Sequence, residues 1–240
     1  MESLEAELSR ARELDETILA DAIESIGFEC TRCGACCKGY DAEESGCHTT
    51  TEPHTATIFP DEIRGVADAT GYDWRDIARP MPYGLTTEED GTQTGETFEW
   101  ALQTTSCGDC TFYREQAGVG RCAVHTDRPL ICQTYPFSVD LGGTTQPMGE
   151  PVDQQGIVRA HECEGLGRDI SRADAEALAE ALKERAIREL TEAIGVRDRY
   201  HPVTGESVVV YDSEGAKRQD GQPIDETTDS ESHDCTDSGR

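Results

Sequence analysis

Apolar residues recur at helical spacing near the start of the chain. Between residues 2 and 26 they lie three, four or seven positions apart, which predicts one amphipathic helix. Gly27 is a suitable residue to end this helix. The apolar face consists of Leu4, Leu8, Ala11, Ile18, Ala22 and Ile26. We expect it to cover the core of the protein.

A second apolar stripe predicts a helix over residues 171–194. Ser171 and Asp174 resemble a capping box at its start, and Gly195 predicts its end. Residues 199–212 then alternate around a Thr-Gly turn, which predicts a β-hairpin. Residues 213–240 are acidic and nearly without large apolar groups, which is typical of a disordered tail.

The long middle segment, residues 28–168, has only short periodic stretches separated by Gly-, Pro- and Thr-rich loops. A core built from such pieces needs support from another source, because few long elements are present to pack together. The short elements that the pattern predicts are strands at 57–59 and 97–102, a helix at 60–69 and a helical piece at 73–78.

Four cysteines lie within eight residues at the start of this middle segment. Residues 30–37 read Cys-Thr-Arg-Cys-Gly-Ala-Cys-Cys, and Gly34 allows the chain to bend there. Thiols at this spacing are typical ligands of a soft metal ion, and a hydrophobic core does not require them. Further thiols follow at Cys107, Cys110, Cys122, Cys132 and Cys163.

The charge of the chain indicates what kind of solution and which partners the protein is suited to. The formal net charge is -28, and the acidic residues are spread over the whole length. An acidic, lysine-poor chain of this kind is typical of salt-loving (halophilic) organisms. We find no basic patch, which argues against nucleic-acid binding.

The start of the chain lacks a basic segment followed by an apolar one, and the sequence shows no transmembrane segment. We therefore expect no membrane association and a cytoplasmic location, where thiols stay reduced. The 11 cysteines could instead form the disulfide framework of a secreted protein, but their odd number and the adjacent pair argue against it.

The cysteines and their neighbours together resemble the YkgJ-type cysteine-cluster family, whose members are described as zinc- or iron-chelating. The resemblance spans roughly residues 28–168. It rests on the order of Cys30-x2-Cys33-Gly34-x-Cys36-Cys37, Cys110-x-Phe112, Cys122, Arg128-Pro129-x2-Cys132-x2-Tyr135-Pro136-Phe137 and Cys163-x-Gly165-x-Gly167. It implies a zinc or iron–sulfur site and a distant kinship with flagellin lysine-N-methylases, without a settled activity.

The family pattern implies eight thiolate ligands: Cys30, Cys33, Cys36, Cys37, Cys110, Cys122, Cys132 and Cys163. Cys107 and Cys47 are additions to the pattern, and His125 stands where the family has an aromatic residue. These three are additional candidate ligands. Arg128, close in sequence to the ligands, is a candidate donor of hydrogen bonds to sulfur.

Adjacent side chains diverge in an extended or turning backbone. The sulfurs of Cys36 and Cys37 are therefore expected to point apart, towards two different metal sites. Eight thiolates suffice for two four-thiolate zinc sites, for two iron–sulfur clusters, or for one of each. The spacing alone does not decide which metal binds.

These observations predict an α+β, helix-dominated fold with an irregular, loop-rich, metal-stapled core and a few short strands, flanked by terminal amphipathic helices. The expected parts are an N-terminal helix (1–27), a cysteine-cluster domain (28–168), a C-terminal helix with a hairpin (169–212) and a tail (213–240). The leading hypothesis is a cytoplasmic protein whose thiolates hold zinc or an iron–sulfur cluster.

Two alternatives remain open at this point. The first is an iron–sulfur redox or lysine-N-methylase-like methyl-transfer enzyme, although the sequence has no nucleotide-binding fingerprint. The second is an interaction module in which the metal is a scaffold and the terminal helices bind a protein partner.

Overall fold

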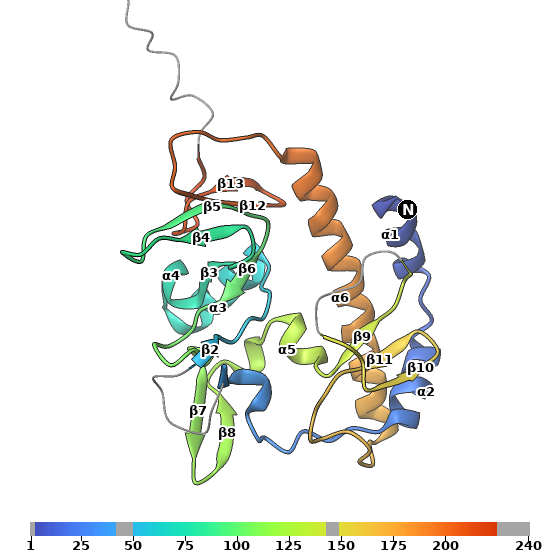
Figure 1. The fold of residues 1–240 in the computed structure, drawn as a ribbon. Helices are drawn as coiled ribbons and strands as arrows, with labels where there is room; N and C mark the ends of the chain where they lie inside the picture. The colour runs from blue at the N-terminus through green and yellow to red at the C-terminus, as the bar shows by residue number, and fades with distance from the viewer. Residues whose placement is uncertain (1–2, 42–49, 143–148, 225–240) are drawn as a thin grey trace, which may run out of the picture.

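The computed structural model describes residues 3–41, 50–142 and 149–224, and Figure 1 shows their arrangement. The α-helices are α1 (Leu4–Arg12), α2 (Glu16–Ile26), α3 (Pro60–Thr70), α4 (Trp74–Ile77), α5 (Leu130–Thr134) and α6 (Arg172–Arg199), with 3-10 turns η1 (Ala35–Cys37) and η2 (His125–Asp127). The strands are β1 (Tyr40–Asp41), β2 (Thr50–Glu52), β3 (Ala78–Pro80), β4 (Leu85–Thr87), β5 (Gln93–Thr97), β6 (Trp100–Leu102), β7 (Tyr113–Gln116), β8 (Val119–Cys122), β9 (Phe137–Val139), β10 (Asp153–Gln155), β11 (Val158–Ala160), β12 (Val208–Asp212) and β13 (Gly215–Lys217).

The expectation of a helix-dominated fold with a few strands is wrong. Helices take up 36% and strands 22% of the structure, and the strands form several small sheets, so the fold is mixed α/β. The largest sheet has the order β13-β12-β5-β4, with β12 parallel to β5. The prediction of a strand at 97–102 is confirmed in part by β6, but most other strands could not be predicted, because most are three to five residues long and too short to show an alternating pattern.

The predicted helix over residues 2–26 is in fact two helices, α1 and α2. The break comes at Asp15, whose carboxylate accepts a hydrogen bond from the Thr17 amide at 2.8 Å and caps α2. Both helices lie along α6 (Figure 1): α1 packs with Leu8 and Ala11 on its C-terminal half, and α2 packs on its N-terminal half. The break lets each helix cover a different part of α6.

The predicted C-terminal helix exists and begins at Ser171, which caps it as expected, but Gly195 does not end it. The helix continues to Arg199. A Cβ atom at position 195 would lie 2.5 Å from the Cβ of Ser213, so glycine is required there for the close approach of the β12–β13 turn. A glycine inside a helix costs about 1 kcal/mol relative to alanine, which this packing must offset.

The predicted hairpin over 199–212 is also wrong, and so is the predicted disorder of 213–240 as far as residue 224; residues 225–240 lie outside the described residues. β12 pairs with β5 and with β13, and β13 lies inside the segment expected to be a tail. Lys217 of β13 is buried, and its ammonium lies 2.9 Å from the Asp212 carboxylate, which also accepts a hydrogen bond from the Trp100 indole at 2.9 Å. An acidic, polar sequence folds here because its buried charges are paired.

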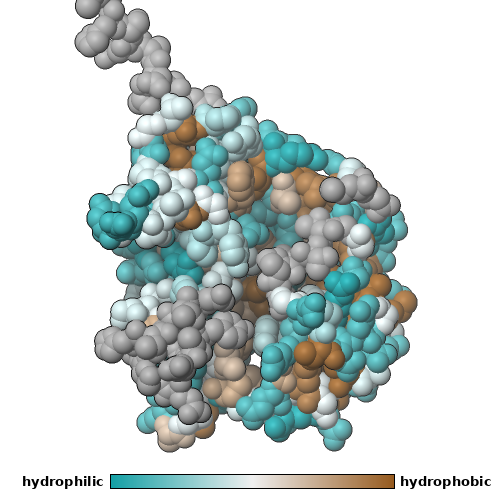
Figure 2. Space-filling view, in the orientation of Figure 1, coloured by the Kyte–Doolittle hydropathy of each residue, from teal (hydrophilic) through white to brown (hydrophobic). Residues whose placement is uncertain are grey.

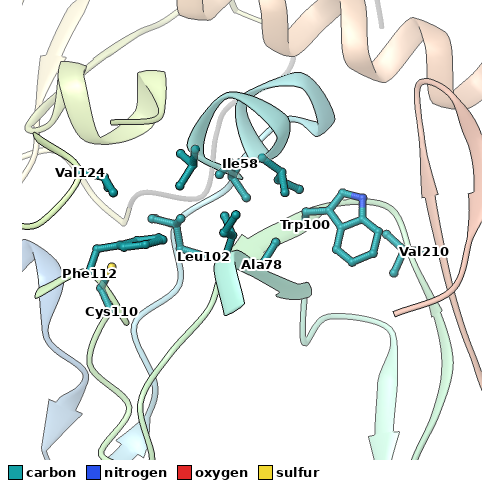
Figure 3. Close-up of a cluster of buried hydrophobic side chains, with 12 residues drawn as sticks. Ile58, Ala78, Trp100, Leu102, Cys110, Phe112, Val124 and Val210 are labelled. Carbon is teal, nitrogen blue, oxygen red and sulfur yellow. The ribbon is translucent and has the colours of Figure 1, made fainter. Parts of the chain in front are cut away.

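Three hydrophobic clusters result from this arrangement, and the smallest lies between α1 and the C-terminal half of α6. Figure 3 shows the first, which we call the strand core, where Phe112, Leu102 and Trp100 pack between α3 and the short strands. The second, which we call the helix core, is formed by α2, α6 and the β9–β11 sheet around Phe137. Arg185 of α6 lies at the helix core and donates hydrogen bonds to Thr134 Oγ1 and to the Phe137 carbonyl, which fixes the position of α5.

The outer face shown in Figure 2 is mostly hydrophilic, with apolar residues in small separate patches. Within the residues that the structure describes, none of the helices is both long and apolar enough to cross a membrane.

Candidate metal centre

The cysteine loop, residues 28–37, is shaped by Gly34. Its φ of 80° lies in the left-handed region, and the 3-10 turn Ala35–Cys37 follows directly. A Cβ atom at this position would lie 2.3 Å from the Tyr113 hydroxyl oxygen. Glycine is therefore required both for the backbone conformation and for the contact with β7.

The loop is held on two sides by backbone hydrogen bonds. At its start, the Glu29 amide donates to the Gly165 carbonyl at 3.0 Å, next to Cys163. At its end, the Cys110 amide donates to the Cys37 carbonyl at 2.8 Å. The first half of the loop is thus attached to the turn after β11, and the second half to the segment before β7.

All eight cysteines of the expected ligand set are free thiols in the structure. They come from the cysteine loop, the segment before β7, the end of β8, helix α5 and the turn after β11. They are Cys30, Cys33, Cys36, Cys37, Cys110, Cys122, Cys132 and Cys163. The fold brings together thiols that are up to 133 positions apart in the sequence.

A first group of thiols surrounds Cys163. Burial is the main cause that raises the pKa of its thiol, and the neighbouring sulfurs of Cys36, Cys33 and Cys30 raise it further. The Gly165 amide donates a hydrogen bond to Cys163 Sγ at 3.4 Å. Such amide-to-sulfur bonds are typical of thiolate ligands, because they stabilise negative charge on sulfur.

A second group packs against the strand core. Cys110 is a buried member of that core, and Cys37, Cys122 and Cys132 pack against it as partly buried side chains. Burial raises the pKa of Cys110 to about 11, and burial together with the neighbouring thiols also raises the pKa of Cys132. These thiols are neutral at neutral pH unless a cation compensates their charge.

The sulfurs of Cys36 and Cys37 lie 3.8 Å apart, so the expectation that they point apart is wrong. The 3-10 turn brings the two side chains together. A hydrogen bond between them lowers the pKa of Cys36 to about 7 and raises that of Cys37. Sulfurs at this separation are close enough to bind one ion together, or two ions that lie next to each other.

Arg128 lies close to thiols of both groups. Its positive charge lowers the pKa of Cys36, Cys122 and Cys132, although other effects are larger for each thiol. The guanidinium Nε donates to the His125 carbonyl at 3.0 Å, which holds it beside the cluster. This position fits the role expected for Arg128, which stays a prediction.

Two of the three additional candidate ligands, His125 and Cys107, do not add a free thiol or a buried imidazole to the eight thiols. His125 is exposed, and the charge of Arg128 lowers its pKa. Cys107 is disulfide-bonded and so offers no thiolate. Cys47 lies outside the described residues.

The donor set fits a soft cation such as zinc or iron, because the eight donors are thiols, which are soft ligands. In the described part of the chain, no three His, Cys, Asp or Glu side chains are already placed to hold one ion together. Metal binding therefore requires the thiols of each group to move closer together.

Two features of this region were missed by the sequence analysis. Lys38, which follows Cys37 in the sequence, pairs with Glu115 at 2.8 Å and lies 5.3 Å from the centre of the Tyr113 ring. A cavity of about 440 Å³ also opens beside Cys30 and Arg128. Neither the Lys38–Glu115 pair nor the cavity could be predicted from the local sequence, because the residues that form each of them are distant along the chain.

A loop-rich domain with eight free thiols gathered from distant segments defines a cysteine-cluster protein. The chain belongs to the CxxCxxCC family, described as a putative zinc- or iron-chelating domain, whose model matches residues 29–164. This match confirms the family expected from the cysteine spacing. Neither a curated protein nor a solved structure shows significant similarity to the chain.

Proposed function

We propose that the protein binds two metal ions, zinc or iron, each through four thiolates. The first site would use Cys30, Cys33, Cys36 and Cys163, and the second would use the strand-core thiols Cys37, Cys110, Cys122 and Cys132. The observation that carries the proposal is that Cys30, Cys33 and Cys36 neighbour Cys163, whereas four other thiols belong to or pack on the strand core. Cys36 also lies near Cys110, Cys122 and Cys132, so it stands where the two groups meet.

The two halves of the cysteine loop support this division. The first half is bonded to the turn that carries Cys163, and the second half to the segment that carries Cys110. Between them, the Arg32 carbonyl accepts a hydrogen bond from the Gly120 amide of β8, the strand that ends at Cys122. Because adjacent Cys36 and Cys37 lie where these halves meet, each can serve a different ion while the ions remain close together. The Arg128 charge would offset part of the formal charge of -2 on a divalent ion with four thiolates.

Metal content per chain tests the number of sites. Protein purified without oxygen should contain about two metal ions per chain. Cys33→Ser and Cys122→Ser each remove one ligand from a different group, and each should leave about one ion. Cys235→Ser, outside the family match, is the control and should leave the content unchanged. Loss of all metal in both single variants would contradict two separate sites.

Metal removal tests whether the ions are also structural. Trp100 belongs to the strand core on which the second group packs. Chelation should therefore reduce the near-ultraviolet circular dichroism signal, because that signal depends on fixed aromatic packing. An unchanged signal after complete metal removal would show that the fold does not depend on the metal.

A second candidate function is iron–sulfur redox chemistry at the first site. It is favoured by the exposure of Cys30 and Cys36 and by the cavity beside Cys30, which would give a small molecule access to the site. An iron–sulfur centre would supply one-electron transfer when bound. A visible absorbance that dithionite bleaches reversibly would support this role, and a colourless protein that contains only zinc would exclude it.

A further inference from the structure

A cavity of about 430 Å³ lies between α6 and the segments around β5 and β6. Figure 1 shows where these elements lie in the fold. None of the eight free thiols lines it, so it is separate from the candidate metal centre. Its apolar walls include Ile58, Leu182 and Leu190. The volume falls within the range of sites that bind small molecules, roughly 300–1,000 Å³.

Aromatic side chains stand at the mouth of this cavity. Tyr83 is 65% exposed and Phe98 is 47% exposed, and both line it. Trp100 lines the interior and is buried. Aromatic faces exposed around a cavity attract cations, because the face of each ring carries partial negative charge.

The charged groups that line the cavity are mainly acidic. Glu99, Glu189, Glu192 and Asp212 are its four carboxylates, and Arg185 is its one cation. After the ion pairs of two of these carboxylates are counted, two carboxylates remain in excess, and they give the cavity a negative potential that disfavours anionic ligands.

Two of these carboxylates are neutralised within the protein. Glu189 is paired with Arg185 at 2.6 Å. Asp212 is paired with Lys217 at 2.9 Å. Neither is therefore available as the counter-ion of a ligand.

The other two carboxylates lack a cationic partner among the described residues. Glu192 accepts a hydrogen bond from the Ser213 amide at 2.8 Å. The Glu99 carboxylate makes no hydrogen bond or ion pair with any described residue, and its side chain lines the cavity at an exposed position of the chain. The surrounding protein and the Glu192 carboxylate raise the pKa of Glu99 there.

We propose that this cavity binds a small organic cation, an alkylammonium whose apolar body enters between α6 and Trp100. The charged end would lie at the mouth, against the Glu99 carboxylate and the faces of Phe98 and Tyr83. A neutral ligand would leave the unpaired carboxylate without a partner, and an anion would be repelled. This inference does not depend on the proposed metal function.

Titration calorimetry of the full chain with hexylammonium chloride tests the proposal, with 1-hexanol and sodium hexanoate as ligands of the same length. Hexylammonium should bind at least tenfold more tightly than hexanol, and hexanoate should not bind. Quenching or enhancement of tryptophan fluorescence should follow the same titration, because Trp100 lines the cavity.

Glu99→Gln keeps the shape of the side chain and removes its charge, so it should weaken hexylammonium binding at least tenfold. Phe98→Leu should weaken it as well, while hexanol binding stays unchanged. Glu88→Gln, on the turn between β4 and β5 and outside the cavity lining, is the matched control and should bind as the parent protein does. Absence of hexylammonium binding, equal binding of hexanol, or equal effects of the two glutamine variants would overturn the proposal.

Discussion

Arg185 offers the sharpest test of how the fold positions the candidate metal centre. Its side chain is only 2% exposed, and it donates at 3.0 Å to Thr134 Oγ1, at 3.2 Å to the Phe137 carbonyl and at 2.6 Å to the Glu189 carboxylate. Thr134 ends the short helix α5, which carries Cys132. Arg185 thus connects α6 directly to an element of the second thiol group.

Replacing Arg185 by methionine keeps most of the side-chain volume and removes all three bonds. Breaking a buried ion pair by deleting one partner costs about 3–5 kcal/mol. Glu189 is 19% exposed, so partial hydration of its carboxylate lowers the cost. We expect Arg185→Met to lower the free energy of unfolding by about 3 kcal/mol.

Arg188→Met is the matched control on the same helix. Arg188 pairs with the exposed Asp61 and lies 5.0 Å from the centre of the Phe59 ring, so its loss should cost no more than about 1 kcal/mol. Urea denaturation followed by far-ultraviolet circular dichroism measures both variants. The double variant Arg185→Met/Glu189→Leu should recover part of the loss, because it also removes the carboxylate that Arg185 pairs with.

The same variants should differ in metal retention. Arg185→Met removes the hydrogen bonds that hold α5 on α6. A competing chelator should therefore remove metal from the Arg185→Met variant faster than from the Arg188→Met variant. If Arg185→Met is no less stable than Arg188→Met, or if the double variant recovers nothing, the buried bonds of Arg185 do not stabilise the fold as argued.

Two further predictions concern the loop and the acid stability. Gly34→Ala should lower the free energy of unfolding by about 2–3 kcal/mol in urea denaturation. Roughly 1–2 kcal/mol of this comes from left-handed backbone strain, and the rest from the collision of the new Cβ with Tyr113. In a Tyr113→Ala background the collision is absent, so the loss should be smaller. The hydrogen bond from Arg64 lowers the pKa of Glu214 to about 2 from 4.5, so its contribution to stability is present above pH 4.5 and is lost as the pH falls towards 2. Glu214→Gln should therefore flatten the stability curve between these pH values, and Glu88→Gln should not; equal curves for the two variants would show that the Arg64 pair contributes nothing.

The sequence revealed the candidate site better than it revealed the fold. The eight thiols and their family could be predicted because cysteines at these spacings rarely occur in proteins except as metal ligands. The short separation of the Cys36 and Cys37 sulfurs could not be predicted, because it depends on the 3-10 turn after Gly34.

Long helices were also predictable, since their apolar stripes repeat over several turns. The pairing of β12 with β5 was not, because it joins strands more than 100 residues apart through a parallel register. The helix end predicted at Gly195 was wrong for a similar reason. Glycine occurs both at helix ends and at close tertiary contacts, and here it is required by the contact with Ser213, which the sequence does not reveal.

The position of the thiols relative to the strand core and the helix core explains how a loop-rich segment can connect the two. The second thiol group packs on the strand core, while the first half of the cysteine loop is attached beside the helix core, next to Phe28 and Leu166. Two ions held by these groups would join the cores through the eight-residue segment from Cys30 to Cys37. Removing the first ion should therefore loosen the contact between the cores before either core unfolds, because each core keeps its own buried side chains.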